Sequence, residues 1–291
     1  MRLAVVGAAS SHVAQVLRLA AAGALGPTTR VTTLAVPDTE PVPAELLADR
    51  TTGGGSPRTV HRGDGVTLAA ALAGQVDAVL VLTRDARTHR ALADPLLRAD
   101  LPLLVDKPFT ADPDDAAHLV RLAAGRGLPL TSSSALRWHP DVQRARRRWR
   151  SEPGGIGVQA TGPADPDDPH GGLATYAVHT VEAGLAVLRG PVGTSVTVLP
   201  GEGVRTAVVG AGRDVATITV LAPRGCAQTP FQLSVAGADD RTDARLDLGP
   251  DYLLPLLRAF VTGLAAGRAT APGPGGRTLV DTVRITAALS A

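Results

Sequence analysis

The first half of the chain alternates short apolar runs with segments of helical periodicity. The apolar runs lie at 3–6, 31–36, 76–82, 103–105 and 128–131, and the helical segments at 13–24, 68–72, 89–98 and 114–126. Near-continuous hydrophobic runs of this length are typical of strands in a parallel sheet that is covered on both faces. The alternation therefore predicts an α/β fold with a doubly wound parallel sheet in the N-terminal part.

Beyond about residue 151 the pattern changes. A helical segment covers 173–188, β-like runs follow at 195–199, 204–209, 215–221 and 231–236, and further helical segments cover 252–266 and the residues from 278. Gly, Asp and Arg separate the β-like runs, as they do in antiparallel sheets. We therefore expect a nucleotide-type domain at 1–135 and an α+β domain at 136–291 with an open, mostly antiparallel sheet. The C-terminal helix could pack back on the first domain.

A polar motif, Asp106-Lys107-Pro108, directly follows the apolar run 103–105. Ligands of open parallel sheets bind just beyond the carboxyl ends of the strands, so Lys107 lies where ligand chemistry occurs. Pro108 restricts the turn that carries it. A lysine in this position can donate to a hydroxyl or phosphate, or act as a tuned acid. A solvated turn lysine is the alternative for Lys107 considered alone.

The first predicted strand leads into the turn Gly7-Ala8-Ala9-Ser10-Ser11-His12, the context of a Rossmann-type dinucleotide site. Only the first glycine of the Gly-x-Gly-x-x-Gly pattern is present, although Ala9 is small. Ser10 and Ser11 can donate to a phosphate at the helix N-terminus, or cap the helix. Asp38, after the second strand, is placed to accept from ribose hydroxyls. It favours NAD over NADP, although its spacing from Gly7 exceeds the usual figure of about 20 residues.

The composition narrows the classes of partner. The formal net charge is +2, so bulk charge indicates no nucleic-acid or membrane partner. The basic run 144–150 is typical of a solvated helix face. No apolar run is long enough to span a bilayer. The single cysteine, Cys226, excludes a disulfide framework and fits a reducing cytoplasm. We expect a cytoplasmic protein without a metal site.

Along nearly the whole chain, motifs in the same order resemble those of the Gfo/Idh/MocA oxidoreductases, the family of glucose–fructose oxidoreductase and inositol dehydrogenase. The chain resembles a divergent branch of this family. Asp106-Lys107-Pro108 resembles the family's Glu-Lys-Pro. The segment 79–89 resembles its strand ending in Thr-Pro-Asn before a histidine, with Arg84 and Asp85 replacing Pro-Asn. The motif at 137–140 resembles Arg-Phe-x-Pro at the opening of the second domain. The resemblance implies a cofactor site of Gly7, Ala9, Ser10, Ser11, His12, Asp38, Thr83, Arg84, Asp106, Lys107 and Pro108.

The segment Tyr176-Ala-Val-His179-Thr-Val-Glu182 resembles the helix that carries the family's catalytic histidine. His179 and Glu182 lie three residues apart on one helical face, so the carboxylate can orient the imidazole and raise its basicity. Typical members place an aspartate four residues before the histidine, where this chain has Thr175. A structural role for the histidine stays open. Arg137, Tyr176 and His170 are candidate substrate-contacting residues.

The resemblance implies an NAD(P)-dependent oxidoreductase that transfers hydride between a nicotinamide and a hydroxyl or carbonyl of a sugar, polyol or related small molecule. His179 would act as general base, oriented by Glu182, and Lys107 would hydrogen-bond the reacting oxygen. Two alternatives stay open: a binding or regulatory protein without redox activity, and a lyase or epimerase with tightly bound NAD. Alternating Val, Ile and Leu at 215–221 predict a homodimer or homotetramer through the C-terminal sheet.

Overall fold

The computed structural model describes residues 1–42, 57, 59–223, 229–268 and 273–291, and Cys226 lies outside them. Within this part the chain forms two compact units. The first comprises residues 1–110, 114–133 and 253–276, and the second comprises 111–113, 134–252 and 277–291. None of the described helices is long and apolar enough to cross a membrane.

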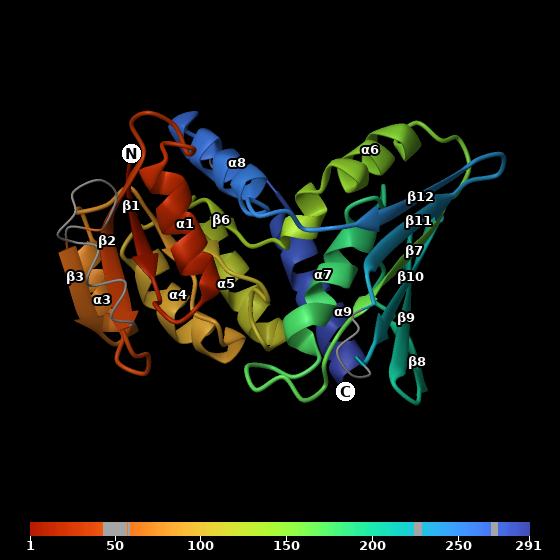
Figure 1. The fold of residues 1–291 in the computed structure, drawn as a ribbon, viewed down its shortest axis with the longest axis horizontal. Helices are drawn as coiled ribbons and strands as arrows, with labels where there is room; N and C mark the ends of the chain where they lie inside the picture. Colours follow the sequence, from red (N-terminus) through yellow and green to blue (C-terminus); the bar gives the residue numbers. More distant parts are fainter. Residues whose placement is uncertain (43–56, 58, 224–228, 269–272) are drawn as a thin grey trace. The chain divides into compact units, whose positions relative to one another are not determined.

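The first unit is built on a parallel sheet with the strand order β3-β2-β1-β4-β5-β6 (Figure 1). Its strands are β1 (Arg2–Val6), β2 (Arg30–Pro37), β3 (Thr59–Gly63), β4 (Ala78–Val81), β5 (Leu103–Val105) and β6 (Leu130–Thr131). Its helices are α1 (Ser11–Ala21), α3 (Gly65–Leu72), η2 (Ala86–Thr88), α4 (His89–Arg98), α5 (Pro113–Gly125) and α8 (Leu254–Ala265). This order is the one found in dinucleotide-binding folds, and the predicted doubly wound sheet is confirmed.

The expected ligand site of this sheet lies at the carboxyl ends of its central strands. The strands β1, β4 and β5 are buried along their apolar residues, from Leu3 to Val6 in β1 for example, which holds them at the centre of the sheet. The strand order reverses between β1 and β4, and the crevice beyond such a reversal is the usual ligand site of these folds. Gly7, Thr83 and Asp106 follow the carboxyl ends of β1, β4 and β5 closely.

The second unit holds a mixed sheet with the order β12-β11-β7-β10-β9-β8, in which only β7 and β10 pair in parallel among the described strands. The predicted open, mostly antiparallel sheet is therefore confirmed. Its strands are β7 (Gly157–Pro163), β8 (Thr197–Gly201), β9 (Val204–Ala211), β10 (Asp214–Leu221), β11 (Phe231–Ala236) and β12 (Arg241–Leu246). Its helices are η3 (Ala135–Trp138), α6 (Pro140–Trp149), α7 (Ala174–Leu185) and α9 (Gly276–Ser290).

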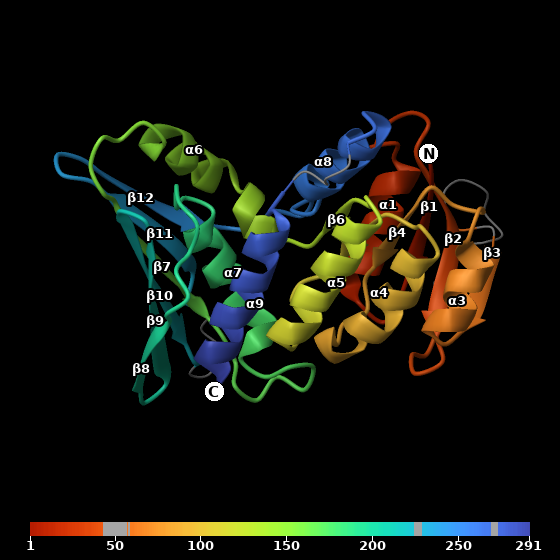
Figure 2. The ribbon, with the colours of Figure 1, turned by 180° about the vertical axis from the view of Figure 1, so that it is seen from behind.

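One face of this second sheet is covered by helix α7, which lies on the same side as α9 (Figures 1 and 2). Ile218 and Val220 of β10 are buried on this face, and Gly184 of α7 packs against Ile218. Thr217 and Thr219 alternate with them onto the opposite face. Val215, which is 47% exposed, and half-buried Leu221 lie on that opposite face as well, so the apolar residues of β10 are divided between the two faces.

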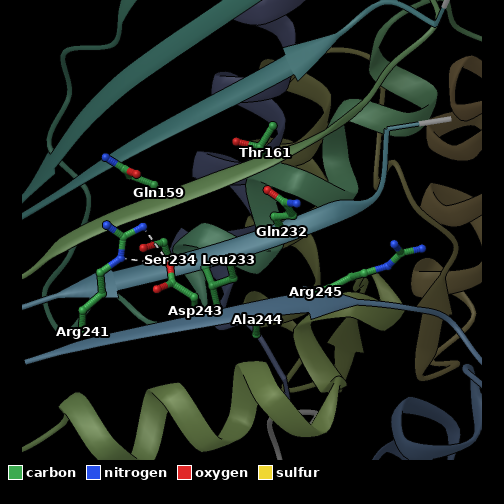
Figure 3. Close-up of a pocket in the computed structure, with 9 residues that line it drawn as sticks. All are labelled: Gln159, Thr161, Gln232, Leu233, Ser234, Arg241, Asp243, Ala244 and Arg245. Atoms are coloured by element: carbon green, nitrogen blue, oxygen red, sulfur yellow. Dashed lines mark hydrogen bonds and ion pairs between the residues drawn. The ribbon is translucent and has the colours of Figure 1, made fainter.

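The open face of the sheet carries polar side chains from β7, β11 and β12. They surround a pocket of about 330 Å³ (Figure 3). Its polar lining residues are Gln159, Thr161, Gln232, Ser234, Arg241, Asp243 and Arg245. Arg241 donates to Asp243 over 2.9 Å, so part of this charge is already paired. An occupant of this pocket would meet mainly hydrogen-bonding groups.

Candidate active site

The turn between β1 and α1 is shaped by Gly7, whose φ of 113° lies where L side chains are strained. A Cβ at this position would come within 2.9 Å of the Thr83 backbone nitrogen, so the turn and the end of β4 require glycine here. Ser10 caps α1, with its hydroxyl accepting from the His12 backbone N–H at 3.2 Å. The turn therefore keeps the close packing of a dinucleotide site with a single glycine.

An acid that the sequence analysis missed reaches this turn. Glu40 accepts hydrogen bonds through Oε2 from the backbone N–H groups of Ala8 at 2.7 Å and Ala9 at 3.2 Å. Asp38, the predicted ribose ligand, lies exposed directly after β2, and its own backbone N–H donates to the Gly63 carbonyl at 3.3 Å. The signal for Glu40 was a second acid two residues after Asp38, but its target depends on the tertiary fold.

The Asp106-Lys107-Pro108 motif follows β5, and Asp106 faces the first turn of α1. The Asp106 carboxylate lies 2.7 Å from His12 Nδ1, and both side chains are largely buried. Its other oxygen accepts from the Lys107 backbone N–H at 2.8 Å. Burial would raise the pKa of Asp106, but the charge and hydrogen bond of His12, with Lys107 and His89 nearby, lower that pKa to about 2. Asp106 thus stays ionised beside Lys107.

Lys107 stands out in composition as well as in position. It is the only lysine of the chain, and the remaining residues in the count of lysine and arginine are all arginines. An ammonium differs from a guanidinium in being a compact cation whose pKa can be tuned toward neutrality. The peptide bond between Lys107 and Pro108 is cis. The motif therefore presents a single ammonium group at the ligand edge of the sheet.

The buried His89 joins the loops that follow β4 and β5. Its Nε2 lies 3.0 Å from the Thr83 carbonyl oxygen, and its Nδ1 lies 2.9 Å from the carbonyl oxygen of Pro108. The Thr83 hydroxyl is 2.9 Å from that of Thr88, while Arg84 is exposed. His89 therefore fixes the loop of Lys107 to the loop of Thr83, two segments that the resemblance assigns to the cofactor site.

Replacing Asp106 by asparagine is expected to lower the free energy of unfolding at pH 7 by about 2 kcal/mol. The pKa of Asp106 falls from 3.8 to about 2 on folding, so its ionisation stabilises the fold above pH 3.8 and loses this effect as the pH falls through about 2. The difference from wild type should shrink below pH 3.8.

Urea unfolding at pH 7 and at pH 3 measures this effect. Asp247→Asn is the control, because Asp247 is 70% exposed in its pair with Arg245, and its loss should change stability by less than about 1 kcal/mol. An Asp106→Asn variant as stable as wild type at pH 7 would contradict the stabilising role of the His12–Asp106 pair.

His179 projects from α7 and is 7% exposed. Its Nδ1 lies 2.7 Å from the hydroxyl oxygen of Ser134, which also accepts from the Leu136 backbone N–H at 3.1 Å. Either atom can be the donor in this contact, and when Nδ1–H donates to the hydroxyl the lone pair lies on Nε2. Ser134 precedes η3 and was not predicted, since its role depends on the packing of η3 against α7.

Glu182, on the same face of α7, forms a buried ion pair with Arg137 of η3. Arg137 Nε donates to Glu182 Oε2 at 2.6 Å, and both side chains are less than a tenth exposed. Among the described residues, the buried Nη2 of Arg137 has no hydrogen-bond partner. Arg137, predicted to contact substrate, is therefore held by the acid that was predicted to orient His179.

The other two candidate substrate residues lie at the start of α7. Tyr176 is 42% exposed, and its ring centroid is 5.8 Å from that of His179. His170 is half-buried, and its backbone N–H donates to Asp168 Oδ1 at 2.9 Å. The same carboxylate accepts from the Thr175 hydroxyl at 3.1 Å, so an acid from the preceding loop reaches the position where the family usually carries aspartate.

Residues 1–133 match the model of the family described as "Oxidoreductase family, NAD-binding Rossmann fold". Among curated proteins, the chain is 33% identical over 96 residues to UDP-N-acetylglucosamine 3-dehydrogenase of Acidithiobacillus ferrooxidans. This match covers 33% of the chain and 30% of the relative's length.

Solved structures match over the full chain. UDP-N-acetylglucosamine 3-dehydrogenase GnnA from Acidithiobacillus ferrooxidans superposes with a TM-score of 0.73 at 20% identity, covering 100% of this chain and 98% of its own. The WlbA (WbpB) dehydrogenase from Thermus thermophilus, in complex with NAD and UDP-GlcNAcA, superposes with a TM-score of 0.73 at 17% identity. This match covers 100% of this chain and 95% of the WlbA chain. At these identities the likeness establishes a shared fold.

Proposed function

Residues 1–133 belong to the Gfo/Idh/MocA oxidoreductases with their NAD-binding Rossmann fold, and from this premise we propose that the chain is an NAD-dependent dehydrogenase acting on a hydroxyl group of a sugar, polyol or related molecule. The predicted family resemblance and NAD as cofactor are confirmed. The observation that carries the proposed activity is the ammonium of Lys107 beside an ionised Asp106 at the carboxyl end of β5. In the proposed enzyme, residues 1–135 bind the dinucleotide and 136–291 bind substrate.

The turn after β1 has the chemistry that a dinucleotide requires. Its backbone N–H groups at Ala8 and Ala9 point to one anionic oxygen, that of Glu40, so the turn is able to hold an anion. Gly7, Ser10 and the N-terminus of α1 are the groups that would hold the pyrophosphate, and Asp38 the adenosine ribose. Thr83, Arg84 and Pro108 are placed on neighbouring loops of the same sheet edge.

The proposed mechanism uses one base and one cation. The nicotinamide, when bound, supplies the hydride acceptor. Nε2 of His179 takes the proton of the substrate hydroxyl, while Nδ1–H donates to Ser134 and thereby fixes the tautomer. Lys107 donates to the reacting oxygen and stabilises the negative charge that develops there. Glu182, on the same helix as His179, acts with Arg137 of η3 as a positioning pair.

We propose a nucleotide-linked sugar as the first substrate to test. GnnA is named for UDP-N-acetylglucosamine, and the WlbA structure holds UDP-GlcNAcA with NAD. Inositol and unmodified sugars are the comparison substrates, since they offer the same secondary hydroxyl group without a nucleotide. Formation of NADH with one of them tests the oxidoreductase, whereas conversion of substrate with no net NADH would favour a lyase or epimerase that recycles NAD.

Isothermal titration with NADH and NADPH tests the cofactor site. Wild type is expected to bind NADH more tightly than NADPH, because the Asp38 carboxylate would accept from ribose hydroxyls and repel a 2′-phosphate. Asp38→Asn should weaken NADH binding by about tenfold, the effect of losing a charge-assisted hydrogen bond. Tighter binding of NADPH would contradict the role of Asp38, and no binding of either would overturn the proposed function.

We propose that the protein is cytoplasmic, as its single cysteine suggests, and that it forms a homodimer or homotetramer through the open face of the second sheet. This face carries polar side chains from β7, β11 and β12 and the exposed Val215 of β10, so an interface there would combine hydrogen bonds and charges with apolar burial. Light scattering at micromolar concentration should give the mass of at least two chains. A monomer under these conditions would refute this assembly.

A further inference from the structure

The carboxylate of Glu40 lies where the proposed dinucleotide site offers its backbone donors. We propose that Glu40 is an internal anion that holds the N–H groups of the β1–α1 turn in the free protein and withdraws when a pyrophosphate binds. This inference rests on the proposed function. It makes Glu40 a residue that sets cofactor affinity, distinct from Asp38, which is exposed directly after β2.

The backbone of Glu40 is fixed by neighbouring strands. Its N–H donates to the Pro37 carbonyl at 2.9 Å, closing a turn directly after β2. Its carbonyl accepts from Arg62 Nη2 at 3.2 Å, which ties it to β3. With its main chain held at these two places, the side chain extends to the turn after β1. The contact with Ala8 and Ala9 is thus directed by the sheet.

The charge of Glu40 fits the end of the helix that it approaches. The first turn of α1 contains no acid, so the positive end of the helix dipole lacks an anion from its own sequence. Glu40 supplies this anion from the turn after β2, and accepts from the backbone N–H groups of Ala8 and Ala9 at 2.7 and 3.2 Å. A pyrophosphate is also anionic and uses the same kind of donor, so the two groups repel one another and compete for the turn.

Competition and a direct role in binding predict opposite changes in dinucleotide affinity when the charge of Glu40 is removed. If Glu40 must leave the turn, removing its charge favours the dinucleotide. If Glu40 instead accepts from a ribose hydroxyl in the complex, removing its charge weakens binding. Glu40→Gln keeps the size of the side chain and removes the charge. We expect this variant to bind NADH about tenfold more tightly, the usual difference between a charge-assisted and a neutral hydrogen bond.

The experiment compares wild type, Glu40→Gln and Glu202→Gln by isothermal titration with NADH and, separately, with inorganic pyrophosphate. Glu202 is exposed in the second unit, so its variant has the same change in net charge without touching the turn. Glu40→Gln should bind both probes more tightly, with Glu202→Gln close to wild type. Hydrogen exchange of the free protein adds a readout without ligand: the amides of Ala8 and Ala9 should exchange faster in Glu40→Ala.

The outcomes separate the inference from the proposed function. Wild-type binding of NADH with equal or weaker binding by Glu40→Gln would overturn the inference and leave the dehydrogenase proposal standing. Unchanged exchange at Ala8 and Ala9 in Glu40→Ala would also overturn it, since the contact would then be absent in solution. If no form of the protein binds NADH, the proposed function is wrong and the inference falls with it.

Discussion

Replacing His179 by alanine is expected to lower turnover by about 10² to 10⁴, the usual contribution of a general base. The imidazole is 7% exposed, and its Nδ1 is fixed at 2.7 Å from Ser134, so the ring is held in one orientation. No other described side chain of α7 can take a proton near neutral pH in this way. The affinity for NADH should change little, because the residue belongs to the second unit.

Steady-state kinetics on a substrate that the wild type oxidises measure this effect, with circular dichroism to show that the variant is folded. Ser134→Ala should reduce turnover by about tenfold and alter its pH profile, since it removes the partner that fixes the tautomer. His118→Ala is the control, because His118 pairs with Asp94 on the surface of the first unit. Wild-type turnover in a folded His179→Ala variant would show that the histidine is structural.

Replacing Lys107 by alanine is expected to reduce turnover by about a hundredfold or more, the effect of losing one donor to a developing oxyanion. The loop that carries Lys107 is held by the His12–Asp106 pair and by His89, so the change should leave the surrounding loop in place. Because Lys107 is the only lysine, no other ammonium side chain in the chain can substitute for it.

Lys107→Arg is the matched variant, since it keeps the positive charge but replaces a compact ammonium by a planar, permanently charged guanidinium. If Lys107 only supplies charge, this variant should recover most of the activity. If it donates in a tight geometry, turnover should stay low while NADH binding persists. Full activity in Lys107→Ala, with NADH bound as in wild type, would remove Lys107 from the proposed mechanism.

The sequence predicts the strands that have continuous or alternating apolar residues and misses strands that lack such a pattern. The strands β1, β4 and β5 are continuous apolar runs, so their pattern needs no tertiary information. The strand β3 (Thr59–Gly63) and the strand β12 (Arg241–Leu246) are edge strands with polar side chains, and their pairing decides their conformation. Central β7 (Gly157–Pro163) was missed because its apolar members are small.

In the candidate site, too, some residues could be predicted from the sequence and others could not. Asp106-Lys107-Pro108 could be identified because the motif is contiguous and follows a strong strand. The partners of these residues could not, because they come from distant parts of the chain: His12 is 94 residues from Asp106, and Ser134 is 45 residues from His179. The spacing along the helix predicts that the Glu182 carboxylate orients His179. The structure shows an ion pair between Glu182 and Arg137, a partner that the spacing does not reveal.

The first unit is not a continuous stretch of chain, and this affects how it is made. Residues 253–276, with α8, belong to it, and Arg258 of α8 donates to the Ala24 carbonyl at 2.8 Å. During synthesis the nucleotide-binding part therefore lacks one of its helices until residues 253–276 have left the ribosome. A fragment ending at residue 133 would lack the apolar side chains of Leu256, Leu257 and Phe260, which are buried in the intact chain. Each unit is thus assembled from separate stretches of the chain, and neither corresponds to one continuous segment that could be excised.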